Sequence, residues 1–192
     1  GEGSAPQTKI QYIKGTIMDT NEIAFSDLFD EKVTTVCFTG HREIAKDKEE
    51  EVRNTLASVL ASLYARGARI FKTGGALGFD TMAAIAVIAL RAETDDDEIK
   101  LKLYLPAPDQ AENFPESDKK VYEIIKGQAS DVFYSSDESN TESFLARNRR
   151  LVEGSDVCVA YCTESKGGSY YTCRLAMSEG VELINIADLI GI

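Results

Sequence analysis

Two glycine-rich turns contain residue types that could bind a phosphate group. Each turn is predicted to follow a strand and to open a helix, where unpaired backbone N–H groups and a partial positive charge attract anions. A purely structural role is the alternative for either turn taken alone. The residues assigned to a candidate site are Gly74, Gly75, Gly78 and Asp80 in the first turn, and Gly167, Gly168, Ser169 and Thr172 in the second.

A third turn brings polar side chains to the same predicted edge. The sequence TGHR follows the first predicted strand and adds Thr39, Gly40, His41 and Arg42 to the candidate site. An arginine can hold a phosphate through two parallel hydrogen bonds, which lysine cannot reproduce. His41 could instead only stabilise its turn.

Further cations are expected at this edge of the sheet. Lys72 and Lys166 accompany the glycine turns, and Arg147, Arg149 and Arg150 lie on the helix before the fifth predicted strand. Arg147 is assigned to the candidate site, whereas the other two arginines lie off the apolar helix face and a solvated position is the simpler expectation for them. An acidic chain that gathers glycines and cations at one edge predicts an anion-binding protein.

The sequence allows two roles for each of two polar residues, Asn148 and Asp80. Asn148 lies in the middle of an apolar helix face, so its amide must find hydrogen-bond partners. It either ties this helix to a neighbouring loop or contacts a ligand directly. Asp80 either caps the helix that it begins or takes part in chemistry, and it is the one weak candidate for a catalytic residue.

The glycine turns differ from two well-known phosphate-binding motifs. From Thr73 the first turn reads T-x-G-x-x-G, so the first glycine of the dinucleotide fingerprint is missing. The next strand ends in Pro106 and not in an acid suited to a ribose. Neither turn continues into the GK[ST] of a P-loop.

Short apolar strands alternate with helix-like segments over residues 33–192. This pattern predicts an α/β fold, a Rossmann-like three-layer α/β/α domain with a mostly parallel sheet of about six strands. The helix "TMAAIAVIALRA" is expected to be buried in the core. Residues 1–32 do not fit the alternation and are expected to form an N-terminal arm or extension. The six strands are predicted at residues 33–40, 68–75, 99–108, 130–136, 156–162 and 181–188.

Composition limits the classes of partner. The net charge of −11 argues against binding to nucleic acid or anionic membranes, because both rest on cationic contacts. No apolar run approaches the roughly 20 residues of a membrane span. The four cysteines form no CxxC pair and the chain has one histidine, so buried free thiols in a reducing compartment are expected, without a metal or a cofactor. The expected location is the cytoplasm.

The motifs together resemble a known superfamily. "TGHR", "GGALGFD", "NRRLVEGSDVCVAYC" and "GGSYYTCRLAMSEG" occur in an order that resembles the DprA/LOG superfamily, called SLOG, and most closely its YpsA-like branch of bacterial proteins. The resemblance spans about residues 33–188. It implies a Rossmann-like sheet with a site for a nucleotide or a nucleotide-derived ligand.

The superfamily contains several activities, so the resemblance leaves function open. LOG enzymes cleave the N-glycosidic bond of a nucleoside monophosphate, but Cys173 and Arg174 stand where their glutamate is expected. DprA proteins bind single-stranded DNA, against which the charge of this chain argues. The first interpretation is therefore a nucleotide-binding sensor, or an enzyme acting on a nucleotide derivative. Phosphoribohydrolase-like cleavage and DprA-like DNA binding are the alternatives, and a homo-oligomer stays open.

Overall fold

A six-stranded parallel sheet organises the domain in the computed structural model, which describes residues 32–192. The predicted N-terminal arm lies outside the described residues except for Lys32. The strands are β1 (Thr35–Gly40), β2 (Ile70–Thr73), β3 (Lys100–Leu105), β4 (Asp131–Tyr134), β5 (Val157–Tyr161) and β6 (Glu182–Asn185). The helices are α1 (Glu49–Ala65), α2 (Phe79–Thr94), α3 (Glu116–Gln128), α4 (Thr141–Val152), α5 (Gly167–Ser178) and α6 (Ile186–Leu189).

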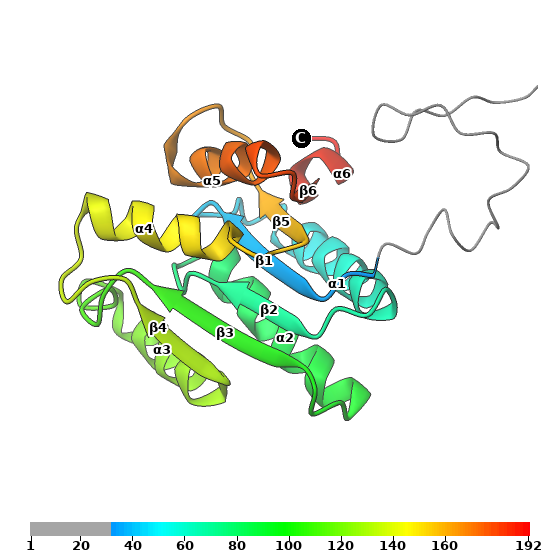
Figure 1. Ribbon diagram of the computed structural model, residues 1–192, viewed down its shortest axis with the longest axis horizontal. Coiled ribbons are helices and arrows are strands. Elements are labelled where there is room, and N and C mark those ends of the chain that lie inside the picture. Colours follow the sequence, from blue (N-terminus) through cyan, green and yellow to red (C-terminus); the bar gives the residue numbers. More distant parts are fainter. Residues whose placement is uncertain (1–31) are drawn as a thin grey trace, which may run out of the picture. The chain divides into compact units, whose positions relative to one another are not determined.

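The strand order is β4-β3-β2-β1-β5-β6, and every pair of neighbours is parallel. Helices α1, α2 and α3 lie on one face of the sheet, and α4 and α5 lie on the other (Figure 1). This is the predicted Rossmann-like α/β/α arrangement. The chain moves outward from β1 in both directions, so the order reverses between β1 and β5. Ligands of open α/β sheets bind at such a point, beyond the carboxyl ends of the strands.

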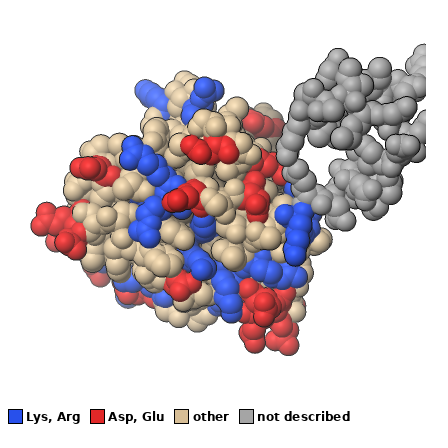
Figure 2. Space-filling model, in the orientation of Figure 1, with Lys and Arg blue, Asp and Glu red and all other residues tan. Residues whose placement is uncertain are grey.

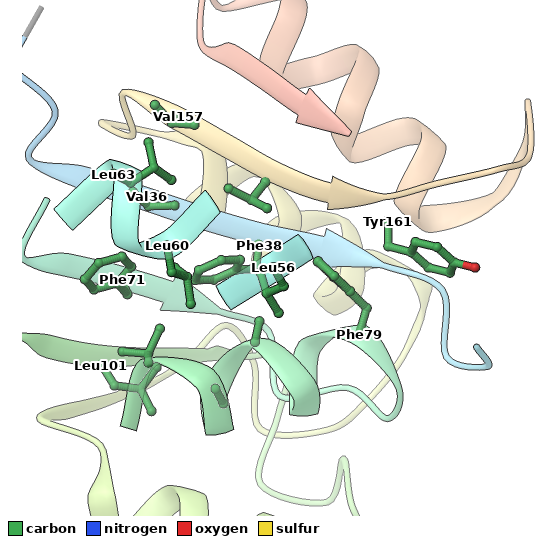
Figure 3. Close-up of a cluster of buried hydrophobic side chains, with 14 of the residues drawn as sticks. Val36, Phe38, Leu56, Leu60, Leu63, Phe71, Phe79, Leu101, Val157 and Tyr161 are labelled. Atoms are coloured by element: carbon green, nitrogen blue, oxygen red, sulfur yellow. The ribbon is translucent and has the colours of Figure 1, made fainter. Parts of the chain in front are cut away.

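The larger core lies between the sheet and the α1–α2 layer. Phe38 of β1 stacks on Phe71 of β2 with ring centroids 6.3 Å apart, and Leu56 and Leu60 of α1 cover them (Figure 3). These side chains come from helical spacing in α1 and from alternate positions in the strands. A smaller apolar layer packs α4 and α5 against the opposite face.

Helix α2 is less buried than its composition predicts. Ile85 is 50% exposed, and a groove of about 660 Å³ runs between α1 and α2. One face of α2 packs against the sheet through Ala83, Ala84 and Val87, while the other lines this groove. The expectation of a helix buried in the core therefore holds for only one face of α2. No helix among residues 32–192 is long and apolar enough to cross a membrane.

Candidate functional site

A cavity of about 370 Å³ opens at the carboxyl edge of the sheet, where the strand order reverses. It brings together nine of the residues assigned to the candidate site from sequence. Its remaining walls come from Ala76, Phe144 and Leu151. The nine are Thr39, Gly40, His41, Arg42, Asp80, Arg147, Asn148, Gly168 and Ser169.

A buried ion pair forms one wall of this cavity. Nη1 of Arg147 lies 3.7 Å from Oδ2 of Asp80 and donates a hydrogen bond of 2.6 Å to the carbonyl of Gly74. The Asp80 carboxylate also accepts a hydrogen bond from the N–H of Ala76. Burial raises the pKa of Asp80, and the charge of Arg147 and the backbone N–H groups oppose this rise. Asp80 thus holds the loop before α2 and the guanidinium of α4 together.

Two guanidinium groups lie against one aromatic ring. Arg42 and Arg147 lie 5.9 Å and 5.7 Å from the ring centroid of Phe144. Burial lowers the pKa of Arg147, and the nearby charge of Arg42 lowers it further. Only Asp80 opposes these two cations within the cavity lining, so an anion placed between them would relieve their repulsion. Phe144 was not among the residues predicted for the site, although it lies one helical turn before both Arg147 and Asn148.

One buried polar group in the cavity wall, the Nε of Arg147, has no hydrogen-bond partner in the described part of the chain. Asn148 follows it on α4, is 6% exposed and lines the same cavity. Buried polar groups without partners are rare in folded proteins.

His41 has a partner within the protein. Its Nε2 accepts a hydrogen bond of 2.8 Å from the N–H of Thr163, so the ring proton of the neutral imidazole lies on Nδ1. Its ring also packs edge-to-face on Tyr161. His41 thus connects the loop after β1 to the loop after β5, and these two loops frame the cavity.

The two glycine turns differ in what lies beside them. A Cβ at Gly74 would overlap the guanidinium of Arg147, and one at Gly78 would overlap the backbone of Arg42. By contrast, a Cβ at Gly168 would have no atom within 4 Å. The first turn is therefore filled by protein atoms, while the second faces open space.

The N-terminus of α5 also has free donors. Its N-cap is Lys166, which makes no side-chain capping hydrogen bond. The N–H groups of the first turn of α5, like those of any helix, lack an intrahelical partner, and without a side-chain cap they can hydrogen-bond an anion.

Five of the assigned residues do not line the cavity. Gly74, Gly75, Gly78 and Gly167 shape the turns around it. Thr172 is fully buried, and its hydroxyl donates to the carbonyl of Gly168.

Three of the predicted edge cations point elsewhere. Nζ of Lys72 donates a 2.6 Å hydrogen bond to the carbonyl of Glu153, which follows the C-terminus of α4 at the opposite edge of the sheet. Arg150 lies over the rings of Tyr104 and Phe133, and Arg149 is exposed. A lysine at a helix C-terminus stabilises the helix dipole, which explains why Lys72 is drawn away from the site.

The visible face over α4 and α5 carries both signs of charge. Figure 2 shows Lys and Arg interspersed with Asp and Glu on this face, without one continuous positive band. Residues 32–192 also contain no group of three or more His, Cys, Asp or Glu side chains able to hold a metal ion.

Comparison with solved structures finds the same fold in DNA processing protein A. The protein from Helicobacter pylori, known for a single-stranded DNA binding mode, matches with a TM-score of 0.56 and 24% identity over 81% of this chain and 66% of that chain. The protein from Streptococcus pneumoniae matches with a TM-score of 0.57 and 21% identity, over 82% of this chain and 50% of that chain.

Comparison with curated proteins finds bacterial relatives. A UPF0398 protein from Bacillus cereus strain G9842 is 32% identical over 109 residues, which are 55% of this chain and 58% of the relative. A UPF0398 protein from Bacillus thuringiensis strain Al Hakam is 29% identical over 134 residues, 68% of this chain and 72% of the relative. The match thus covers little more than half the length of the first of these relatives. The YpsA family model, described as the YspA SLOG family, matches residues 36–183, and the chain therefore belongs to this family.

Proposed function

We propose that the cavity beside α4 binds a nucleotide or a nucleotide-derived ligand, as a sensor or as an enzyme acting on a nucleotide derivative. The phosphate lies at the N-terminus of α5, on the backbone of Gly168 and Ser169. Arg42 clamps it from the loop after β1. Asn148 and the Arg147–Asp80 pair orient the ribose or the base.

The unpartnered Nε of Arg147, with Asn148 beside it, carries this proposal. Asn148 and the Nε of Arg147 are adjacent in sequence and line the same cavity. Leaving a buried donor or acceptor unpaired costs about 1–3 kcal/mol, so a structure retains such groups most readily where a ligand completes their hydrogen bonds. A ligand with both an anionic end and a hydrogen-bonding end fits them together with the uncapped helix α5.

The place and size of the cavity agree with this ligand class. Small-molecule sites occupy roughly 300–1,000 Å³ and occur at the switch point of α/β sheets. The cavity of about 370 Å³ falls at the lower end of that range. A mononucleotide or a small derivative is therefore a better fit than a dinucleotide. The free cysteines suit a protein of the reducing cytoplasm.

A ligand panel tests the proposal. Thermal shift and calorimetry are run with AMP, GMP, ADP-ribose, a cyclic dinucleotide and a short single-stranded oligonucleotide. A ligand that binds only the native state raises the melting temperature with its concentration. A response to a mononucleotide or ADP-ribose supports the proposal. A response to the oligonucleotide alone, with an affinity that collapses as salt rises, supports DprA-like binding instead.

Gly168→Ala is expected to weaken binding of the responding ligand at least about tenfold without lowering stability, because the new methyl group occupies the open space where the phosphate would contact the backbone. Gly127→Ala is the matched control, since Gly127 lies in α3, away from the cavity, and a Cβ there would likewise have no atom within 4 Å. Calorimetry measures both affinities. Equal affinities for the two variants would remove the α5 N-terminus from the site.

Arg42→Ala is expected to weaken binding about 10- to 100-fold with little change in stability, because Arg42 is exposed and its charge-assisted hydrogen bonds would be made to the ligand. Arg149→Ala removes the same charge from an exposed position outside the cavity lining, and it should keep wild-type affinity. Titration calorimetry at two salt concentrations measures the affinities of the Arg42→Ala and Arg149→Ala variants. A similar loss in both variants would indicate only a general electrostatic effect.

Cleavage of an N-glycosidic bond is the alternative that one observation favours. Asp80 is the one carboxylate in the described lining of the cavity, and burial raises its pKa. A carboxylate near the scissile bond would stabilise an oxocarbenium-like transition state. Chromatography of AMP and GMP after incubation with the protein distinguishes the two functions. Release of free base identifies an enzyme, and intact nucleotide together with binding identifies a sensor.

A further inference from the structure

The loop between β5 and α5 is anchored at its first two residues. The N–H of Cys162 donates a 3.0 Å hydrogen bond to Oδ1 of Asn185, and the Cys162 carbonyl accepts a 2.9 Å bond from Nδ2 of the same residue. The N–H of Thr163 donates to Nε2 of His41 over 2.8 Å. Cys162 is the one free cysteine of the four that is not buried, so the predicted buried thiols are confirmed for the other three.

The rest of this loop leads directly to the cavity. Residues 163–168 are exposed, and the stretch ends in the first turn of α5, where Gly168 and Ser169 line the cavity. An exposed loop samples several conformations unless hydrogen bonds to the body of the protein hold it. The bond from Thr163 to His41 can therefore decide where the N-terminus of α5 lies.

The backbone and the ring of His41 are themselves fixed. Its N–H donates to the carbonyl of Tyr161 over 3.1 Å, and its carbonyl accepts a 3.0 Å hydrogen bond from the N–H of Phe79, the first residue of α2. Its ring packs edge-to-face on that of Tyr161, with centroids 5.7 Å apart. His41 thus connects three parts of the cavity frame, which are the loop after β1, the start of α2 and the loop after β5.

The bond to Thr163 requires one state of the imidazole ring. A backbone N–H can donate only to a ring nitrogen with a free lone pair, so Nε2 carries no proton and the ring is the neutral Nδ1–H tautomer. The hydroxyl of Thr163 lies 3.1 Å from the same Nε2. The two partners are 122 positions apart in sequence, so His41 does more than stabilise its own turn.

We propose that His41 is a positioning residue whose neutral Nε2 holds Thr163 and thereby places the first turn of α5 at the cavity. His41 acts through the loop and needs no contact with a ligand. Its effect on ligand binding rests on the proposed function, because Gly168 and Ser169 of this turn are the residues proposed to hold the phosphate.

The first test needs no ligand, because His41 is the only histidine of the chain. Nuclear magnetic resonance of the full chain labelled with nitrogen-15 observes its two ring nitrogens without overlap. We expect a protonated Nδ1, an unprotonated Nε2 and a protected Thr163 amide in hydrogen exchange. A ring with its proton on Nε2 would overturn the proposal.

Three variants separate the acceptor from the shape of the ring. His41→Phe keeps an aromatic ring against Tyr161 but has no acceptor. The Thr163 amide should then exchange at least about tenfold faster, and AMP and ADP-ribose should bind about 3- to 10-fold more weakly, the size of one lost hydrogen bond. His41→Gln supplies an acceptor oxygen without the ring and should restore most of both. Thr163→Val keeps the backbone N–H without the hydroxyl and should behave as the wild type.

Hydrogen exchange and calorimetry with AMP and ADP-ribose are read together. Unchanged exchange in His41→Phe would overturn the positioning role, and a loss that His41→Gln does not restore would assign the effect to the ring and not to its acceptor. Faster exchange with unchanged affinity would refute the effect on the site. Should His41→Phe fail to fold, the tautomer of the wild type still decides. A wild type that binds neither nucleotide counts against the proposed function and leaves the positioning of the loop to the exchange data.

Discussion

Arg147→Met is expected to lower the free energy of unfolding by about 3–5 kcal/mol, the cost of leaving one partner of a buried ion pair without the other. The side chains of Arg147 and Asp80 are 8% and 6% exposed, so water cannot replace the lost partner. The variant also removes the hydrogen bond to the carbonyl of Gly74, which keeps only the donor from Gln110. Urea unfolding of the variant and the wild type measures the difference.

The loss should depend on pH in a defined direction. Burial holds the pKa of Asp80 above its ordinary value of 3.8, and Arg147 is the largest influence opposing that rise. A carboxyl with a raised native pKa binds its proton more tightly in the folded protein, so its contribution to stability declines as pH rises through that pKa. Removing Arg147 raises the pKa further. The deficit of Arg147→Met should therefore be larger at about pH 7.5 than at about pH 5.

A double variant separates the charge from the packing. Asp80→Asn in the Arg147→Met background removes the unpaired carboxylate and should recover part of the lost stability, because a neutral amide costs less to bury than a charge. Measured against the Asp80→Asn single variant, the deficit of the double variant should no longer depend on the titration of Asp80. A loss below about 1 kcal/mol in Arg147→Met would mean that water reaches Asp80 and that the pair is not a buried one.

The sequence was sufficient to predict the fold class because its signals are local. Apolar alternation in the strands and helical spacing in α1 depend on neighbours within one element, and their βα order dictates a parallel sheet. The ends of the helices and strands were predicted less accurately. The predicted last strand turns into α6 at Ile186.

The site was predictable in its location but not in its internal roles. The predicted ends of the strands located the site at the carboxyl edge of the sheet, and nine of the assigned residues line the cavity there. The role of Gly74 depends on Arg147, which is 73 positions away in sequence, so no local pattern reveals it. Lys72 was predicted to be a cation at the carboxyl edge of the sheet. Its amine instead donates to the carbonyl of Glu153 after α4, at the opposite edge. Roles that depend on such tertiary partners are not encoded in the spacing of one motif.

Gly74→Ala is expected to lower the free energy of unfolding by about 1–3 kcal/mol, as overpacking in a filled interior does, and to abolish the response to the nucleotide panel. The added methyl group would overlap Nη1 of Arg147 and would lie 2.9 Å from Oδ2 of Asp80. Arg147 must then leave the carbonyl of Gly74, and its unpartnered Nε leaves the cavity wall with it. Urea unfolding and thermal shift measure the two effects.

Two comparisons test whether the guanidinium is the cause. Gly168→Ala makes the same chemical change where no atom is near, so it should leave stability unchanged. In the Arg147→Met background the clashing nitrogen is absent, so Gly74→Ala should then cost clearly less than it does in the wild type, with only the close contact to Asp80 remaining. A double-mutant cycle measures this coupling. Additive losses would show that Gly74 is required for its own backbone geometry, and the first glycine turn would then act independently of Arg147.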